Sequence, residues 1–262
     1  MAVVLITGGA RGIGLGIVEA FANAGHEVMI GDLGGSGGDW NYGLSTGEDL
    51  KKAVSNQKGE VASVELDVTQ ADSCAQAVEH TLERFGGLDI LINNAGVVDS
   101  GAIEEFDEES WDKIFMVNTK GIFLMTRAAL GPLKKSDHAA IVNTASIAGK
   151  QGVANMSAYC GSKFAAIGVT QSLALELAKV DITVNAVCPG IVGTAMWLDH
   201  LLPSNFVAGD EKKQNFDEMM AERIPLGRAQ TAKDVADAVL YLAMARNVTG
   251  IALTVSGGIQ LN

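Results

Sequence analysis

Short apolar runs alternate with longer helical segments along almost the whole chain. This alternation is typical of βαβ units, in which helices cover both faces of a parallel sheet. We find no internal repeat, linker or domain break, so we expect a single domain over residues 1–262. The predicted strands lie within residues 3–7, 27–32, 61–67, 88–96, 139–145, 181–190 and 251–258. The predicted helices lie within residues 15–25, 48–59, 69–87, 110–135, 159–178 and 231–245.

Two segments interrupt this alternation. Residues 33–47 contain six glycines in fifteen positions, and this composition predicts a flexible surface loop. The loop directly follows the second strand, so it either folds over the adenosine end of a cofactor through Trp40 or Tyr42, or stays mobile. Residues 197–223 are rich in acidic side chains and lie just after a strand end. We predict that they form a lid over the substrate.

The first strand is followed by the sequence TGGARGIG and then by a helix. Glycines at positions 8, 12 and 14 allow a tight turn and a close approach of the backbone to a ligand. The N-terminus of the following helix offers free amides to a pyrophosphate. A glycine-rich turn between a strand and a helix therefore predicts a dinucleotide site.

Asp32 ends the second strand, 18 residues after Gly14. A carboxylate at this position would accept hydrogen bonds from the adenosine ribose and repel a 2′-phosphate, which favours NAD over NADP. Arg11 acts in the opposite sense, because a cation beside the phosphates helps to hold NADP. We give Asp32 more weight since its position is the one that meets the ribose. Without a cofactor, Asp32 would simply begin a turn.

Other strand ends are also polar or turn-forming. Asp67 and Val68 follow the third strand, where a carboxylate can meet an adenine amino group. Asn94, in the sequence NNAG, and Pro189, in PGIVGTAM, follow later strands. The carboxyl ends of parallel strands meet at one edge of a sheet, so these segments predict a single ligand site at that edge.

Tyr159 and Lys163 are four positions apart in a strongly helix-forming segment. This spacing places both side chains on one face of the helix. Ser146 lies thirteen residues upstream of Tyr159, after a run that predicts a strand ending in a turn. A hydroxyl facing a Tyr/Lys pair suits proton transfer to or from an alcohol oxygen. A buried helix with a snorkelling lysine would show the same spacing, so the pair alone does not decide between the two interpretations.

A free tyrosine has a pKa of about 10, which is too high for a base near neutral pH. We expect the Lys163 ammonium to lower the pKa of Tyr159, and a cationic ring in the same pocket would lower it further. We expect Ser146 to hydrogen-bond the substrate oxygen as charge develops on it.

Asn118 interrupts the apolar centre of the helix predicted at residues 110–135. A buried amide within a helix needs a hydrogen-bond partner. Two alternatives stay open: the amide is satisfied within the protein, or it holds a water molecule in a proton path.

Composition and charge exclude several classes of function. The formal net charge of −12 argues against nucleic acid or an anionic membrane surface as a partner. No apolar run approaches a membrane span, and the N-terminal sequence predicts no signal peptide. The three cysteines are widely spaced, which predicts reduced thiols in a cytoplasmic protein and neither a disulfide framework nor a metal site.

Taken together, TGGARGIG, NNAG, Asn118, Ser146, Tyr159-x-x-x-Lys163 and PGIVGTAM resemble the short-chain dehydrogenase/reductase family, in the expected order over essentially all 262 residues. The resemblance implies a single Rossmann-like, doubly wound α/β domain with a seven-stranded parallel sheet, and usually a homotetramer. It implies that Tyr159 is the general acid/base and that Ser146 positions and polarises the carbonyl. It also implies that Lys163 binds the nicotinamide ribose and that Asn118 supports a proton-relay water.

The resemblance also predicts the cofactor site. Positions that match cofactor-contacting residues of the family are Gly8, Arg11, Ile13, Asp32, Asp67, Val68, Asn94 and Thr194. From the same motifs we add Gly12, Gly14, Ala95, Gly96, Tyr159, Lys163, Pro189, Gly190 and Val192. Two features depart from the family. The insertion at 33–47 leaves the adenosine contacts in doubt, and Ser256 replaces a common Asp, which leaves a C-terminal structural contact in doubt.

Within the family, PGIVGTAMW, IPLGR and SGGIQLN look most like bacterial diol, acetoin and polyol dehydrogenases. We therefore predict NAD-dependent interconversion of a small secondary alcohol, a diol or sugar alcohol, and its ketone. The segment MWLDHLLP is similar to sorbitol-6-phosphate dehydrogenases, so a phosphorylated polyol is an alternative substrate. A non-catalytic, nucleotide-sensing protein is an alternative of a different class. The predicted substrate pocket consists of Ser146, Gln151, Asn155, Met156, Tyr159, Trp197 and His200.

Overall fold

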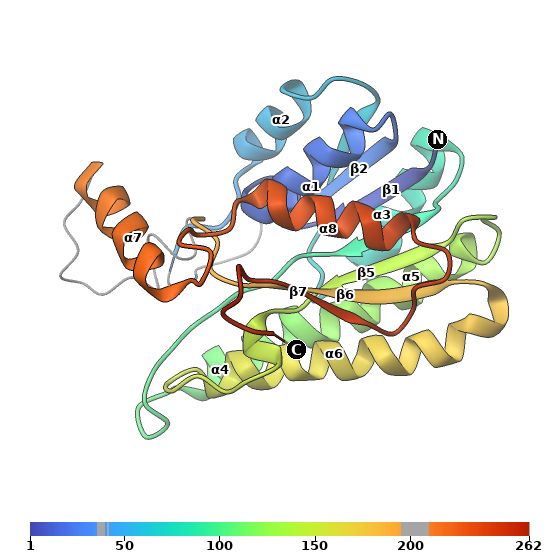
Figure 1. Ribbon diagram of the computed structural model, residues 1–262. Coiled ribbons are helices and arrows are strands. Elements are labelled where there is room, and N and C mark those ends of the chain that lie inside the picture. Colours follow the sequence, from blue (N-terminus) through green and yellow to red (C-terminus); the bar gives the residue numbers. More distant parts are fainter. Residues whose placement is uncertain (36–39, 41, 195–209, 262) are drawn as a thin grey trace.

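A computed structural model of the chain describes residues 1–35, 40, 42–194 and 210–261. The strands form a seven-stranded sheet in the order β3-β2-β1-β4-β5-β6-β7, and every neighbouring pair is parallel. Helices cover both faces of this sheet (Figure 1). The predicted α/β class and the seven-stranded parallel sheet are thereby confirmed.

The elements follow the predicted runs closely. The strands are β1 (Val3–Thr7), β2 (Glu27–Asp32), β3 (Val61–Glu65), β4 (Ile90–Asn93), β5 (Ala140–Thr144), β6 (Thr183–Pro189) and β7 (Ala252–Val255). The α-helices are α1 (Gly12–Asn23), α2 (Gly47–Ser55), α3 (Ala71–Phe85), α4 (Glu108–Phe115), α5 (Gly121–Leu133), α6 (Ser157–Leu177), α7 (Asp210–Arg223) and α8 (Ala232–Met244). In the described part of the chain, no helix is both long enough and apolar enough to cross a membrane.

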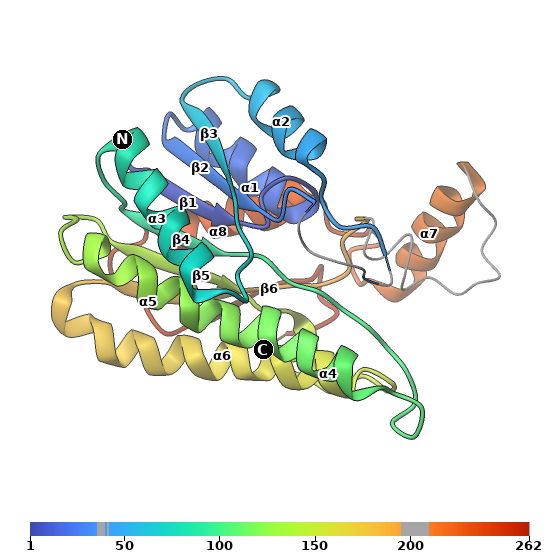
Figure 2. The same ribbon diagram turned by 180° about the vertical axis from the view of Figure 1, so that it is seen from behind.

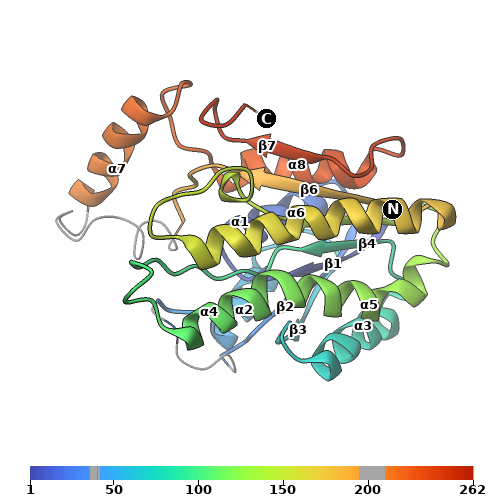
Figure 3. The same ribbon diagram turned by 90° about the horizontal axis from the view of Figure 1, so that it is seen from below.

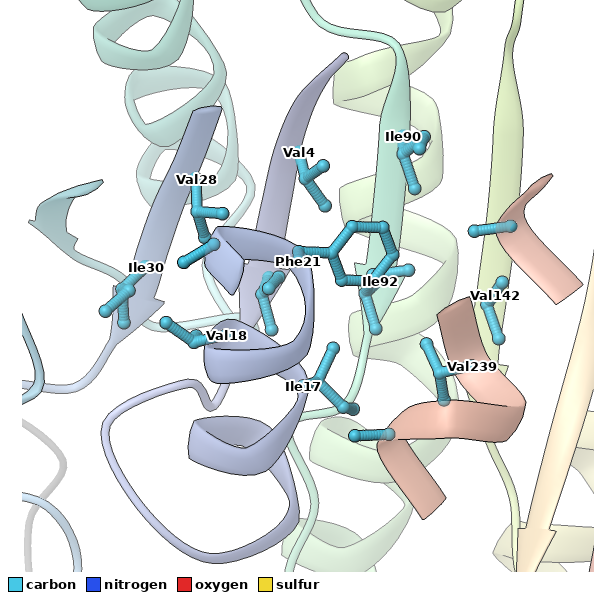
Figure 4. Packing of buried hydrophobic residues seen from close by; sticks show 14 of the residues in the cluster. Val4, Ile17, Val18, Phe21, Val28, Ile30, Ile90, Ile92, Val142 and Val239 are labelled. Atoms are coloured by element: carbon cyan, nitrogen blue, oxygen red, sulfur yellow. The ribbon is translucent and has the colours of Figure 1, made fainter. Parts of the chain in front are cut away.

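Alternate residues of each strand face opposite sides of the sheet, so the buried strands supply two separate cores. On one face, Val4 and Ile92 pack with Phe21 of α1 and Val239 of α8 (Figure 4). Phe21 is fully buried, so its replacement by Ala would destabilise the protein by about 3–5 kcal/mol.

On the other face, the neighbouring strand positions Leu5 and Leu91 pack against Met125 of α5 and Leu177 of α6. Figure 3 shows α5 and α6 side by side across this face. Because both faces are covered, the central strands β1, β4, β5 and β6 are buried along their whole length, and their sequences lack a regular alternation of apolar and polar residues.

The strand order reverses between β1 and β4. The chain runs outward from β1 through β2 to β3, and β4 then returns to the other side of β1. At such a boundary the connecting segments leave in opposite directions, which opens a crevice beyond the carboxyl ends of the strands. The glycine-rich turn after β1 and the NNAG segment after β4 meet at this point.

The single helix predicted at residues 110–135 is instead two α-helices, α4 and α5, joined by a short π-helical segment. Between α4 and α5, residues Met116–Lys120 form a π-turn, in which the helix takes up one extra residue. The side chain of Asn118 turns inward here and bonds to Val97 and Ser162. These bonds to neighbouring elements explain why a sequence with continuous helical periodicity forms an interrupted helix.

Helix α7 projects from one end of the molecule (Figures 1 and 2). Its Phe216 and Met220 pack with Ile191 and Ile224 in a small apolar cluster beside the turn after β6. Residues 197–209 of the predicted lid, which include Trp197 and His200, lie outside the described residues.

The last strand, β7, forms one edge of the sheet. The carbonyls of Ile251 and Val255 accept hydrogen bonds from β6, so the Ala252 carbonyl between them faces away from β6. The Nζ atom of Lys150 donates to this Ala252 carbonyl at 2.6 Å and to Thr254 Oγ1 at 2.8 Å. Lys150 therefore ties the segment after β5 to the edge strand.

Candidate active site

A cavity of about 1100 Å³ lies at the carboxyl edge of the sheet. Every residue of the predicted cofactor site lines it, and these residues come from the segments after β1, β2, β3, β4 and β6 and from α6. They are Gly8, Arg11, Gly12, Ile13, Gly14, Asp32, Asp67, Val68, Asn94, Ala95, Gly96, Tyr159, Lys163, Pro189, Gly190, Val192 and Thr194. The structure thus brings together residues that span most of the chain.

The turn after β1 requires its glycines. Gly8 and Gly12 have φ angles of 65° and 55°, in the left-handed region that favours glycine. A Cβ atom on Gly14 would lie 1.9 Å from the Gly8 carbonyl oxygen. Arg11 occupies the N-cap of α1, and a guanidinium offers no acceptor to the first amides of the helix. These amides remain available to an anion, so the turn fits the diphosphate of a dinucleotide.

Asp32 ends β2 and is 8% exposed. Its Oδ2 atom accepts from Ala10 N at 2.8 Å. Its Oδ1 atom accepts from Leu33 N at 2.8 Å and from the hydroxyl of Ser45. A carboxylate has about four acceptor positions, so Asp32 is held in place and keeps capacity for a ribose hydroxyl.

Ser146 and Tyr159 face each other at the wall of the cavity. Ser146 caps the short 3-10 turn Ile147–Gly149 that follows β5, and its Oγ atom accepts from Ala148 N at 3.1 Å. The hydroxyl hydrogen of Ser146 is therefore available to a second acceptor. Helix α6 begins at Ser157 and places the Tyr159 phenol within reach of the Ser146 hydroxyl.

Lys163 lies one helical turn after Tyr159 and is 4% exposed. Its Nζ atom donates to the Thr144 carbonyl at 2.9 Å and lies 5.7 Å from the centre of the Tyr159 ring. The carbonyl at the end of β5 therefore holds the ammonium beside the phenol.

The structure corrects the expected pKa of Tyr159. Burial of the phenol raises the pKa of Tyr159 to about 12, and the Ser146 hydroxyl opposes this rise by a smaller amount. Burial also lowers the pKa of Lys163 to about 8. Both shifts disfavour the charged form, because desolvation outweighs the attraction between the two groups. The protein's own residues do not produce the low phenol pKa that the Tyr/Lys spacing predicted.

Asn118 is 1% exposed and is satisfied within the protein. Its Oδ1 atom accepts from Val97 N at 2.8 Å, and its Nδ2 atom donates to Val97 O at 2.9 Å and to Ser162 Oγ at 3.0 Å. These hydrogen bonds support the first of the two alternatives for this amide, and the water in a proton path stays a prediction. A Cβ atom on Gly96 would lie 3.2 Å from Asn118 Oδ1 and 3.4 Å from Lys163 Nζ, so the glycine allows the chain to pass close to both groups.

The described part of the glycine-rich insertion packs against the protein. The Lys113 ammonium of α4 lies 4.8 Å from the centre of the Trp40 ring, which meets the Tyr42 ring edge-on at 6.5 Å. Tyr42, Leu44 and Ser45 line the cavity. Of the two alternatives for this loop, the packing supports the one in which it folds over the cofactor site.

The segment between Ser146 and Tyr159 gives the cavity an apolar wall. Ile147, Val153 and the predicted Met156 line it, and the predicted Gln151 adds an amide. Asn155 was expected in the pocket but does not belong to its described lining. Asn155 is exposed, has a φ angle of 63°, and accepts a hydrogen bond from Gly101 N at its own carbonyl. This backbone turn directs the chain away from the cavity at that position.

Several residues that line the cavity were not predicted from the sequence. Leu44 and Ser45 lie in a glycine-rich segment whose composition indicates only a loop, and Lys113 reads as an ordinary exposed helix residue. Arg223 ends α7, where a basic residue is common because it complements the helix dipole. Arg223 nevertheless lines the cavity and adds a positive charge to it.

Comparisons with known proteins agree with this geometry. The sequence model described as short chain dehydrogenase matches residues 2–201. Galactitol 2-dehydrogenase of Agrobacterium fabrum is 37% identical over 251 residues, covering 93% of this chain and 90% of its own length. L-2,3-butanediol dehydrogenase of Corynebacterium glutamicum is 36% identical over 266 residues, covering 99% of both chains.

Solved structures also resemble this chain. The crystal structure of carveol dehydrogenase from Mycobacterium avium in complex with NAD superposes with a TM-score of 0.91. It is 28% identical in sequence, and the match covers 98% of this chain and 97% of that one. The names of these similar proteins differ in substrate, so they leave the substrate of this chain undecided.

Proposed function

Because the chain belongs to the short chain dehydrogenase family, we propose that it is an NAD-dependent oxidoreductase that interconverts a small secondary alcohol and its ketone. One observation carries this proposal: the Ser146 hydroxyl and the Tyr159 phenol face each other at the cavity wall, with the Lys163 ammonium buried beside the phenol. A carbinol or carbonyl oxygen in contact with both hydroxyls would meet a hydrogen-bond donor and a proton carrier at once.

In the oxidation direction, Tyr159 accepts the hydroxyl proton of the substrate, while Ser146 donates a hydrogen bond to the same oxygen as negative charge develops. In the reduction direction, Tyr159 returns the proton to the carbonyl oxygen. When bound, the oxidised nicotinamide ring supplies the hydride acceptor and a positive charge that favours the phenolate. The Lys163 ammonium adds a second favourable charge. The Oδ1 atom of Asn118 accepts one hydrogen bond from the protein and keeps a second lone pair, to which a proton-relay water would donate.

Residues that line the cavity would hold the dinucleotide. The turn from Gly8 to Gly14 would bind the diphosphate, and Asp32 would bind the adenosine ribose. Asp67 would meet the adenine, and Lys163 would bind the nicotinamide ribose. The carboxylate of Asp32 supports NAD over NADP, because it repels a 2′-phosphate.

The lining of the cavity bears on the substrate. The apolar side chains of Ile147, Val153 and Met156 next to the two hydroxyls favour a short diol or another alcohol with apolar carbons over a sugar alcohol. A phosphorylated polyol remains a second candidate on the strength of one observation. Arg223 lines the cavity, and a guanidinium is a strong partner for a phosphate.

A spectrophotometric screen tests the proposal. Butanediol, sorbitol and sorbitol 6-phosphate, with their ketones, would be assayed with NAD(H) and NADP(H) while NADH absorbance is followed. We expect turnover with NAD(H) and a preference for the unphosphorylated alcohols. Absence of turnover with every alcohol, despite binding of NADH, would favour the alternative of a non-catalytic nucleotide sensor. An Arg223→Ala variant would lose activity selectively with the 6-phosphate if the second candidate is correct.

We also propose a cytoplasmic homotetramer. The three cysteines are unpaired and buried, which suits a reducing compartment. Phe123 of α5 and Phe164 and Leu175 of α6 expose apolar side chains on neighbouring helices, as subunit contacts require. Light scattering coupled to gel filtration would test this, and a monomer at working concentration would contradict it.

A further inference from the structure

Four residues of the insertion, Tyr42 to Ser45, cross the cofactor side of the cavity, and we call them the strap. At one end, the Ser45 hydroxyl donates to Asp32 at the end of β2. At the other end, the Tyr42 hydroxyl accepts from Val98 N, after β4, at 3.3 Å. The strap therefore connects the two sides of the β1–β4 boundary, across which a dinucleotide would lie.

The strap also holds Arg11. An Nη atom of Arg11 donates to the Gly43 carbonyl, and the guanidinium carbon lies 6.0 Å from the centre of the Tyr42 ring. This distance is at the outer range of a cation–π contact. Arg11 lines the same cavity as Asp32, and a guanidinium there could neutralise a 2′-phosphate. Its contacts with Gly43 and Tyr42 direct it toward the strap.

Ser45 completes the surface that would face the ribose. It is 4% exposed and lines the cavity next to Asp32. Because the hydroxyl hydrogen of Ser45 is donated to Asp32, its oxygen presents only acceptor lone pairs to other groups. Asp32 and Ser45 together form an acceptor surface. A ribose 2′-hydroxyl can donate to such a surface, whereas a 2′-phosphate has only acceptors and negative charge to offer.

We propose that the strap selects the cofactor: it excludes dinucleotides with a 2′-phosphate by engaging the Arg11 guanidinium with the Gly43 carbonyl and by adding Ser45 to the acceptor surface of Asp32. The inference rests on the proposed use of NAD. Asp32 alone would not exclude a 2′-phosphate completely, because an unrestrained Arg11 would partly offset the negative charge of this carboxylate. The proposal therefore gives the strap a role in cofactor specificity in addition to that of Asp32.

Equilibrium binding of NADH and NADPH tests the proposal without a known substrate. The readout is energy transfer from the protein's tryptophans to the reduced nicotinamide. Tyr42→Ala removes the ring beside Arg11, so we expect NADPH to bind about tenfold more tightly, the size of one charge-assisted hydrogen bond. The double variant Y42A/R11Q should lose this gain. Tyr42→Phe keeps the ring but removes the hydroxyl that accepts from Val98 N, so it should raise the NADPH-to-NADH affinity ratio less than Tyr42→Ala does.

Ser45→Ala should weaken NADH binding several-fold and leave NADPH binding less affected. Arg11→Gln in an otherwise wild-type chain should change NADPH binding little, since the strap already holds the guanidinium. The proposal is overturned if Y42A keeps the wild-type ratio, if its gain persists in Y42A/R11Q, or if R11Q alone abolishes NADPH binding. Should Y42A fail to fold, R11Q and S45A still decide. Failure of the wild type to bind either dinucleotide would instead refute the proposed function.

Discussion

On the β1–β3 side of the sheet, the cavity is walled by main chain and by side chains that hydrogen bonds hold in place. The glycine turn offers its amides, and Asp32 receives hydrogen bonds from Ala10, Leu33 and Ser45. On the β5–β6 side, the wall is made of ionisable groups that folding has removed from water. Burial disfavours the charged forms there, as the pKa values of about 12 for Tyr159 and about 8 for Lys163 record.

This difference separates recognition from chemistry. A dinucleotide can be bound by fixed dipoles and one carboxylate, and these need little desolvation. Proton transfer needs groups whose charge state changes during the reaction. Burial lowers the pKa of Lys163 to about 8 but raises the pKa of Tyr159 to about 12, so formation of the phenolate would depend on the positive charge of a bound cofactor.

The largest expected effect comes from Tyr159→Phe. Removing the phenol hydroxyl eliminates the proton carrier, so we expect kcat to fall by about 10³-fold while NADH still binds. Stopped-flow or steady-state assays with the best alcohol of the screen, together with NADH titration, would measure both. Tyr241→Phe is the matched control, because Tyr241 is exposed on α8 and should keep full activity. If Y159F lost NADH affinity to the same extent as kcat, cofactor binding and proton transfer would not be separable in this protein.

The next effect concerns the pH dependence of stability. Folding lowers the pKa of Lys163 from 10.5 to about 8. Between these pH values the unfolded chain binds a proton at Lys163 that the folded protein has released, so the free energy of unfolding rises with pH through this window. Below about pH 8 the buried ammonium is present and its full cost opposes folding.

Lys163→Met tests this contribution, because Tyr159 and Cys74 titrate in both proteins. The Cys188 thiol also titrates in both, but its pKa, which burial raises, is lowered by Lys163 in the wild type only. The free energy of unfolding of the wild type, relative to K163M, should increase by a few kcal/mol from about pH 7.5 to about pH 10. Urea denaturation at a series of pH values would measure the difference. A difference that stays flat or falls with pH would contradict the assignment of a depressed lysine pKa.

On the cofactor side, Asp32→Asn should reduce the preference for NADH over NADPH by about tenfold, because it removes the charge that repels a 2′-phosphate. The ratio of the two dissociation constants is the measurement. Asp72→Asn, an exposed residue in the first turn of α3, is the matched control. The kcat with saturating NAD should change much less than the ratio of the two dissociation constants. An equally large fall in kcat would contradict the proposed separation of cofactor binding from proton transfer.

The smallest effect is expected from Thr46→Ala. Thr46 follows the strap and caps α2, where its hydroxyl and the carboxylate of Asp49 form a reciprocal capping box. Loss of this cap should destabilise the protein by about 1 kcal/mol and lower Tm by about 3 °C. Scanning calorimetry would detect this shift, with Ser55→Ala in the same helix as control. An equal shift in both variants would mean that the cap contributes nothing specific.

Much of this architecture could be predicted from the sequence because it depends on local patterns. Apolar runs of strand length and the glycines at 8, 12 and 14 placed the sheet and the turn after β1 correctly. The number of strands and their parallel arrangement, however, came from the family resemblance and are confirmed by the structure, which also shows the order of the strands. Periodicity alone would not have shown where the strand order reverses.

The features that sequence reasoning missed depend on distant contacts. The π-turn at Asn118 forms because Val97 and Ser162 supply partners from other elements. The pKa of Tyr159 rises because whole segments exclude water from it, which no spacing between two residues can indicate. The strap could not be predicted, because the glycine content of residues 33–47 indicates a loop but does not indicate that Ser45 contacts Asp32.

The contact of Lys150 with the edge strand β7 has a consequence for aggregation of the protein at high concentration. An outermost strand with unpaired carbonyls is a template on which strands of other molecules can add, and such addition can spread into fibrils. Here the Lys150 ammonium already occupies the outward carbonyl of Ala252. An incoming strand would have to displace a charge as well as form its own hydrogen bonds, so Lys150 acts as a gatekeeper against aggregation along this border.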